Sequence, residues 1–279
     1  MNFPQQPGPI GVFDSGYGGL TVLPGIRQLL PQYDYMYLGD NARAPYGSRS
    51  FEVVYQFTRQ AVRKLVSMGC HLVILGCNTA SAKALRTIQQ RDLPMLDPSR
   101  RVLGIIRPTA ETIGNLTESR HIGVLATEGT IKSQSYSMEI RELFPDIHVS
   151  GVACPLWAAI VEAGEADSPG ADYFVKKRID QLMRKDPLID TIILGCTHYP
   201  LLMSSVVKNV PKSVRIMSQG TYVANSLADY LKRHPEMERN ITQGGTCRYL
   251  TTESEERFSE TARIFLHEDV TVNHVDLTE

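Results

Sequence analysis

Short apolar runs alternate with amphipathic segments of helix length through the first hundred residues of the chain. The apolar runs predict buried strands over residues 10–13, 35–38, 72–75 and 102–106. The segments between them carry apolar residues at helical spacing, and they predict helices over 20–30, 51–68 and 79–90. Strands that alternate with helices in this way are typical of a parallel sheet with helices on both faces.

The pattern restarts in the second half of the chain. Segment 122–130 resembles segment 10–18, since each has an apolar run, then small polar residues, then a helix pattern. The repeat predicts an α/β protein of two similar doubly wound domains with mostly parallel sheets and an active site at their interface. We expect the first domain over 10–107 plus 218–279 and the second over 108–217. Late strands are expected at 247–251 and 270–275, and a loop at 236–245.

Two cysteines stand in matching phrases, one in each half. Cys77 and Cys196 each follow an apolar run and a glycine, so each falls just past the carboxyl end of a strand. Two thiols that face each other across a cleft suit a reaction with a base on one side of a carbon and an acid on the other. A helix that begins near Thr79 would lower the pKa of Cys77 towards neutrality. The alternative is a buried structural cysteine, which we expect for Cys70, Cys154 and Cys247.

Polar residues surround both cysteine phrases. His198 could exchange a proton with Cys196, although a lone histidine is more often structural. Asp14 and Ser15 end the first strand, where they would either cap a turn or assist Cys77 and bind a substrate. The Gly-rich turn after them matches neither a dinucleotide fingerprint nor a P-loop, so no nucleotide site is predicted. Further side chains could hold a carboxylate or line the cleft, namely Tyr46 and Gly47 of a possible β-turn, and Asn78, Thr79 and Thr197.

Composition narrows the class of protein. The chain has 279 residues, of which 42% are hydrophobic and 21% charged, as in ordinary globular proteins. A net charge of -1 without a basic block argues against nucleic acid or an anionic membrane as partner. No run is long enough to span a bilayer, and residues 1–9 lack the regions of a secretory signal, so we expect a frayed tail and a cytoplasmic protein. The five cysteines include no C-x-x-C, which predicts free thiols and no metal site.

Five blocks of this chain resemble, in order, the signature blocks of the bacterial glutamate racemase family. They include Asp14-Ser15-Gly16, Pro45-Tyr46-Gly47, Gly76-Cys77-Asn78-Thr79, Thr127-Glu-Gly-Thr130 and Gly195-Cys196-Thr197-His198, and they cover most of residues 10–202. The resemblance implies a cofactor-independent, two-base enzyme that interconverts L-glutamate and D-glutamate and supplies D-glutamate for peptidoglycan. It also implies a homodimer.

The same resemblance implies roles for single residues. Cys77 and Cys196 would be the bases on opposite faces of the α-carbon, with Cys77 acting on D-glutamate and Cys196 on L-glutamate. Asp14 would assist Cys77, His198 would assist Cys196, and Glu162 would lie near the second thiol. The substrate would be held by further residues together with Asp14 and His198, namely Ser15, Tyr46, Gly47, Asn78, Thr79, Thr197, Thr127 and Thr130.

Some positions depart from the family pattern. Ala126 replaces a frequent glycine, Arg107 stands where Glu or His is usual, residues 96–101 resemble a small insertion, and 217–219 lack a common aspartate.

Other functions stay open at this point. They are a racemase for aspartate or another small amino acid, a non-catalytic amino-acid-binding protein, and a cysteine hydrolase or thiol redox protein.

Overall fold

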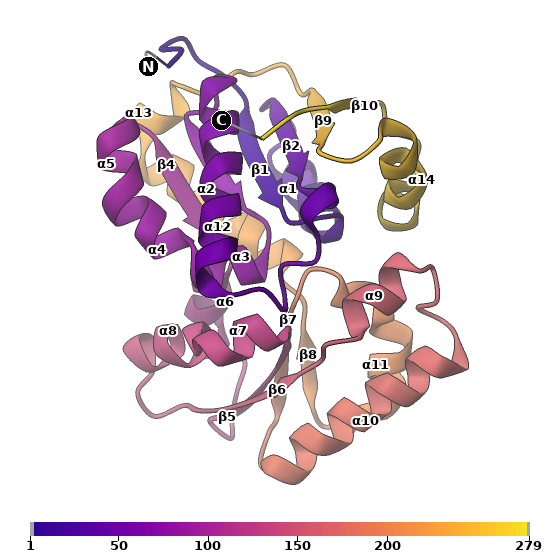
Figure 1. Ribbon diagram of the computed structural model, residues 1–279. Coiled ribbons are helices and arrows are strands. Elements are labelled where there is room, and N and C mark those ends of the chain that lie inside the picture. Colours follow the sequence, from indigo (N-terminus) through magenta and orange to yellow (C-terminus); the bar gives the residue numbers. More distant parts are fainter. Residues whose placement is uncertain (1–2, 278–279) are drawn as a thin grey trace.

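The strands of the computed structural model, which describes residues 3–277, form two separate sheets (Figure 1). The first has the order β10-β9-β2-β1-β3-β4 and the second the order β6-β5-β7-β8, and every paired strand runs parallel to its neighbour. This confirms the α/β class with two doubly wound domains. The strands are β1 Ile10–Asp14, β2 Tyr35–Gly39, β3 Leu72–Leu75, β4 Arg101–Gly104, β5 His121–Ala126, β6 His148–Ala153, β7 Thr191–Gly195, β8 Arg215–Met217, β9 Cys247–Thr251 and β10 Val272–His274.

The two sheets share one topology. The order β2-β1-β3-β4 in the first sheet corresponds to β6-β5-β7-β8 in the second. In each case the first strand in sequence pairs with the second on one side and with the third on the other, which creates a topological switch point. Strands β9 and β10 extend the first sheet beyond β2. The fold therefore carries the duplication that the sequence repeat predicts.

Helices connect the strands and cover both faces of each sheet (Figure 1). Helix α1 begins at Leu23 because Pro24 needs no N–H partner in the first turn. The single helix predicted over 79–90 is divided among α3, α4 and a π-helical turn at Ile88–Asp92. The helices are α1 Leu23–Leu29, α2 Phe51–Ser67, α3 Asn78–Lys83, α4 Leu85–Thr87, α5 Leu93–Leu96, α6 Ile106–Ile113, α7 Glu128–Ser133, α8 Ser135–Leu143, α9 Trp157–Glu162, α10 Pro169–Lys185, α11 Met203–Asn209, α12 Gly220–Arg233, α13 Pro235–Glu238 and α14 Glu255–Leu266, with 3-10 turns at Gly18–Thr21, Asn41–Arg43 and Tyr199–Leu202.

Alternation along the strands divides the core between the two faces of each sheet. Ile10 and Val12 of β1 join the buried cluster that contains α1 and α12, whereas Phe13 joins the cluster on the α2 side. In the second sheet Ile192 belongs with α10 and α11, and Ile193 belongs with α6 and α8. Both faces of each sheet are therefore apolar and packed against helices. The polar residues lie at the strand ends.

The amino-terminal segment corrects the prediction of a frayed tail. Phe3 is buried, Arg100 donates a hydrogen bond to the Pro4 carbonyl, and Gly8 forms a parallel bridge with Ile241. Burial of one aromatic ring and pairing of the backbone hold residues 3–9 against the first sheet. Residues 1–2 lie outside the described part. The predicted loop 236–245 likewise contains the end of α13 and this bridge.

The chain passes between the two sheets twice. The first crossing lies between β4 and α6, and the second lies between β8 and α12. Because α12 packs on α1 and α6 packs on α8, we propose to keep the predicted division into 10–107 plus 218–279 and 108–217. Within residues 3–277, no helix combines the length and apolarity that a membrane crossing requires.

Candidate active site

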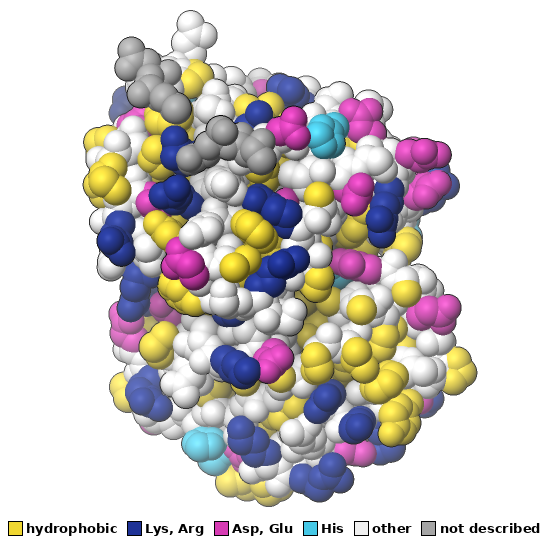
Figure 2. All heavy atoms as spheres, viewed as in Figure 1, with side chains coloured by type: hydrophobic (Ala, Val, Ile, Leu, Met, Phe, Trp, Pro, Cys, Tyr) yellow, Lys and Arg dark blue, Asp and Glu magenta, His cyan; other side chains and the backbone are white. Residues whose placement is uncertain are grey.

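One cavity lies where strands of both sheets end, and its empty volume is about 700 Å³. The surface is hollowed between the two halves of the molecule, at the right of Figure 2. Residues that follow β1, β3, β5 and β7, the strands that flank the two switch points, contribute to its walls. The lining residues are Ser15, Gly16, Ala44, Pro45, Tyr46, Gly47, Ser48, Cys77, Asn78, Thr79, Thr127, Glu128, Cys154, Pro155, Ala158, Glu162, Cys196, Thr197 and His198.

Cys77 follows β3 and Gly76, and it caps helix α3. Its Sγ accepts a hydrogen bond from the Ala80 N–H at 3.4 Å. Burial, and after it the negative charge of Asp14, raise the pKa of Cys77 to about 12. The expectation that the helix terminus would lower this pKa is therefore wrong, because the loss of hydration outweighs the helix N–H groups. Cys77 is a neutral thiol at pH 7 and can donate a proton.

The end of β1 brings two polar side chains to this thiol. Ser15 Oγ lies 3.3 Å from Cys77 Sγ. Asp14 lies behind the cavity wall, where its carboxylate accepts hydrogen bonds from the Gly16 N–H at 2.8 Å and from Thr197 Oγ1 at 3.4 Å. Burial raises the pKa of Asp14 to about 6. Asp14 therefore changes its charge near neutral pH, beside a thiol that is sensitive to it.

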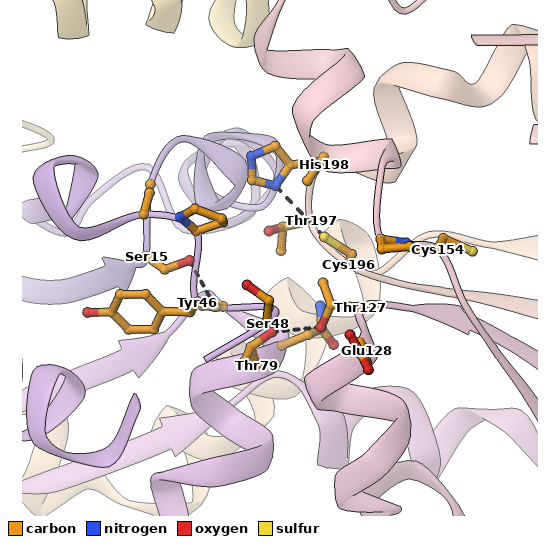
Figure 3. Close-up of a pocket in the computed structure, with 18 of the residues that line it drawn as sticks. Ser15, Tyr46, Ser48, Thr79, Thr127, Glu128, Cys154, Cys196, Thr197 and His198 are labelled. Atoms are coloured by element: carbon orange, nitrogen blue, oxygen red, sulfur yellow. Dashed lines mark hydrogen bonds between the residues drawn. The ribbon is translucent and has the colours of Figure 1, made fainter. Parts of the chain in front are cut away.

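Cys196 has different neighbours. Its Sγ lies 3.8 Å from His198 Nδ1, and His198 Nε2 lies 2.7 Å from Glu162 Oε1 (the first contact is dashed in Figure 3). Burial alone would lower the pKa of His198, but its hydrogen bonds to Cys196 and Glu162 outweigh burial and raise the pKa to about 10. His198 is therefore a buried imidazolium at pH 7, and it places a positive charge 3.8 Å from Cys196 Sγ.

Hydroxyl groups join the two halves around the cavity. Thr21 Oγ1 donates to the Thr197 carbonyl at 2.7 Å, and Thr79 Oγ1 lies 2.9 Å from Thr127 Oγ1. Thr127 also caps helix α7, and its Oγ1 lies 3.1 Å from Thr130 Oγ1. Since Thr130 is buried and outside the cavity wall, it supports Thr127 from behind.

The loop after β2 closes one side of the cavity. Tyr46 contributes to the wall, but its hydroxyl donates a hydrogen bond to Asp40 and is thereby occupied. A side chain at Gly47 would place its Cβ 3.0 Å from the Thr127 Cβ, so glycine allows the two halves to approach closely here. Figure 3 shows Ser15 and Tyr46 on one side of the cavity and Cys196 on the other.

A family model and individual relatives both assign the chain to one protein family. A family model described as Asp/Glu/Hydantoin racemase matches residues 10–226. The chain belongs to this racemase family. A glutamate racemase of Ruegeria sp. (strain TM1040) is 40% identical over 273 residues, which cover 94% of this chain and 98% of the relative.

Solved structures agree with the sequence comparison. The crystal structure of a glutamate racemase from Bacillus anthracis superposes with a TM-score of 0.87 at 36% identity, covering 97% of this chain and 98% of the other. A glutamate racemase from Francisella tularensis, solved in complex with D-glutamate, has a TM-score of 0.85 at 30% identity and covers 96% and 97% of the two chains.

The cavity of this family member gathers most of the residues that the sequence singles out. Asp14 and Thr130 lie just behind its wall, and the others contribute to the wall itself. Their chemical roles stay predictions. No Lys or Arg contributes to the wall, and within the described part of the chain no three His, Cys, Asp or Glu side chains gather as metal ligands do.

Three lining residues with a polar or thiol side chain, Ser48, Glu128 and Cys154, were not assigned to the site, and neither were the apolar Pro155 and Ala158. Ser48 directly follows the Pro45-Tyr46-Gly47 block, and Glu128 lies inside the Thr127–Thr130 block, so the motifs were a usable signal for both. Cys154 directly follows β6, as Cys196 follows β7, but it lacks the preceding Gly-Cys phrase. Its side chain points away from the cavity in Figure 3, and its Sγ lies 3.7 Å from the Val152 carbonyl. This geometry agrees with the structural role expected for Cys154.

Proposed function

We propose that this protein is a cofactor-independent glutamate racemase, an isomerase that interconverts L-glutamate and D-glutamate and supplies D-glutamate for peptidoglycan. The observation that carries the proposal is the pair Cys77 and Cys196, which stand at equivalent strand ends of the duplicated fold and line one cavity. The relatives in Ruegeria and Bacillus anthracis are glutamate racemases that match nearly the whole chain. The Francisella neighbour holds D-glutamate.

The proposed reaction removes the α-proton on one face and returns a proton on the other. A thiolate takes the α-proton, the electron pair of the C–H bond stays on the substrate as a carbanion, and the opposite thiol donates its proton. From L-glutamate, Cys196 is the base and Cys77 is the acid, and from D-glutamate the roles reverse. Positioning, together with donors directed at the substrate carboxylate, has to stabilise the carbanion.

The neighbours of each thiol support this assignment. The imidazolium of His198, held by Glu162, would be the partner of the Cys196 thiolate that the reaction requires. Cys77 keeps its proton because it is buried beside Asp14. Cys77 is therefore ready to act as the acid in the reaction from L-glutamate, and the reverse reaction requires the loss of its proton. We propose that Asp14 assists the deprotonation of Cys77.

Neutral donors and the imidazolium of His198 would hold the substrate, since no Lys or Arg contributes to the wall. Hydroxyl and amide groups bind carboxylates when several converge. We propose that groups of both halves hold the α-carboxylate, the side-chain carboxylate and the ammonium group of the substrate. Asp14 and Thr130 would act from behind the wall, and Tyr46 would act through the shape of the wall. The residues at the wall are Ser15, Gly47, Asn78, Thr79, Thr127, Thr197 and His198.

We further propose a cytoplasmic homodimer that uses neither metal nor cofactor and has no nucleic-acid or membrane partner. The near-neutral charge of the chain argues against a nucleic-acid partner. The homodimer and the independence of a cofactor follow from the resemblance to the glutamate racemase family.

Circular dichroism of L-glutamate and D-glutamate, incubated separately with the pure protein, tests the function. The proposal predicts that the signal of each enantiomer decays to zero without an added cofactor or metal. A panel with L-aspartate and D-aspartate tests the nearest alternative. Decay with aspartate and none with glutamate would overturn glutamate as the substrate, whereas stable signals throughout would favour a non-catalytic binding protein.

A further inference from the structure

A ring of three buried side chains lies behind the cavity wall at Asn78. Asn78 Nδ2 donates to Gln219 Oε1 at 2.6 Å, Gln219 Nε2 donates to the Tyr136 hydroxyl at 2.9 Å, and that hydroxyl donates to Asn78 Oδ1 at 2.7 Å. All three residues are at most 3% exposed. Each group in this ring donates to the next and accepts from the previous one, so the three bonds have one common direction.

An anchor outside the ring fixes that direction. Gln219 Nε2 lies 3.1 Å from the Ile105 carbonyl, which can only accept a hydrogen bond. It also lies 2.9 Å from Thr109 Oγ1, whose own proton goes to the Ile105 carbonyl, so the two hydrogens of Nε2 are shared among three acceptors. The nitrogen of Gln219 therefore has to face this side, and its oxygen has to face Asn78. Of the two amide atoms of Asn78, only the nitrogen can donate to that oxygen, which fixes the orientation of the Asn78 amide.

The ring joins distant parts of the fold. Asn78 begins α3 beside Cys77, and Tyr136 lies in α8 of the second half. Ile105 and Gln219 lie on the two connections through which the chain passes between the sheets. One hydrogen-bonded unit thus links the cavity wall to both crossings.

We propose that Gln219 is a positioning residue that holds the Asn78 amide with its nitrogen ready for a carboxylate oxygen of the substrate. This inference rests on the proposed function. One of the two hydrogens on Asn78 Nδ2 binds Gln219, and the second is left for the substrate. Without the ring, the amide rotates freely between two nearly equivalent orientations, one of which presents its oxygen to an anion.

Three single variants, one double variant and a control test the ring. Gln219→Leu removes every hydrogen bond of the amide, and Tyr136→Phe removes a single oxygen from the same ring. Tyr35→Phe is the matched control, because the buried Tyr35 hydroxyl donates to the Leu30 carbonyl at 2.7 Å, away from the cavity. Asn78→Ala, alone and combined with Gln219→Leu, completes a double-mutant cycle.

The expected result is a rise in KM of about tenfold for both enantiomers in Gln219→Leu and Tyr136→Phe, with a smaller change in kcat, because a hydrogen bond to a charged group is weakened. Tyr35→Phe keeps the kinetic constants of the wild type. In the Asn78→Ala background, Gln219→Leu changes KM less than about twofold, because its effect passes through Asn78.

Other results would overturn the inference. Wild-type KM values in Tyr136→Phe exclude a role for the ring, even if Gln219→Leu does not fold. A tenfold effect of Gln219→Leu that persists in the Asn78→Ala background shows that Gln219 acts by another route. If the wild type itself does not racemise glutamate, the proposed function and this inference both fail, whereas normal wild-type kinetics with unaffected variants overturn the ring alone.

Discussion

The two thiols occupy equivalent places in the duplicated fold, yet their surroundings are opposite in charge. Cys77 follows β3 and has the carboxyl group of Asp14, at the end of β1, as its electrostatic neighbour. Cys196 follows β7, and the corresponding strand β5 ends at the uncharged Ala126, which is the equivalent of Asp14. The charged partner of Cys196 is instead the imidazolium of His198.

The position of each thiol and its protonation state therefore have different origins. The sheet topology places both sulfurs at one cavity, whereas burial beside Asp14 favours a proton on Cys77 and an imidazolium lies beside Cys196. Because enantiomers have equal free energies, the overall kcat/KM values for L-glutamate and D-glutamate have to be equal in water. The asymmetry between the thiols is therefore visible only in separate constants and in half-reactions.

Removal of either thiol has the largest expected effect. Cys77→Ala and Cys196→Ala should each lower net racemisation about 10³-fold or more, because one face of the α-carbon loses its acid or base. Circular dichroism with both enantiomers measures the loss. Cys247→Ala is the control, since Cys247 is outside the cavity wall, and it should retain activity. Substantial turnover by either cavity variant contradicts the two-base scheme.

Loss of the imidazolium should have the next largest effect. His198→Asn should lower kcat/KM about 10²-fold and equally for both enantiomers, because the thiolate of Cys196 loses its cation. His198 also stabilises the folded state below pH 6.5, and this contribution is lost as the pH rises through about 10. Thermal unfolding should therefore show a less stable variant at pH 7 and a smaller difference at pH 10. An equal difference at both pH values argues against a charged His198.

Glu162→Gln should have a moderate effect of about tenfold on kcat/KM, because the amide keeps one contact with His198 but not the negative charge. Glu165→Gln is a nearby control on an exposed residue. Steady-state kinetics between pH 6 and pH 9 compare the two. If Glu162→Gln behaves as the control does, Glu162 has no part in charging His198.

Asp14→Asn should stabilise the folded state, in contrast to the loss of stability expected when His198 is replaced. Burial raises the pKa of Asp14 from 3.8 to about 6, so the charged carboxylate opposes folding at higher pH. The variant should be more stable than the wild type by about 2 kcal/mol at pH 8, and this gain should disappear below pH 4. Urea unfolding at both pH values measures the difference, and a gain that is greatest at low pH would contradict the assignment.

Much of this arrangement was open to sequence reasoning. An apolar run followed by Gly-Cys indicates both a buried strand and the edge where ligands bind, so Cys77 and Cys196 could be placed before any coordinates. The charges of the groups that surround the two cysteines in the fold could not be predicted in the same way. The pKa of Cys77 depends on complete burial beside Asp14, which a local helix argument does not include.

Long-range partners were also hidden from the sequence. Gln219 lies 141 positions from Asn78, and no pattern in a single chain indicates their hydrogen bond. Phe3 and Arg100 likewise fix a segment whose composition is typical of a mobile tail. Periodicity and motifs report local structure, whereas these contacts arise only when the two halves and the ends of the chain pack together.

Exchange of the α-hydrogen with D₂O, followed by proton NMR, tests the difference between the thiols most directly. L-glutamate and D-glutamate are incubated separately with Cys77→Ala and with Cys196→Ala. The account predicts that Cys77→Ala exchanges only L-glutamate and does so readily at pH 7.5. It predicts that Cys196→Ala exchanges only D-glutamate, slowly, and faster as the pH rises. Exchange of both enantiomers by one variant, or faster exchange by Cys196→Ala at pH 7.5, would contradict it.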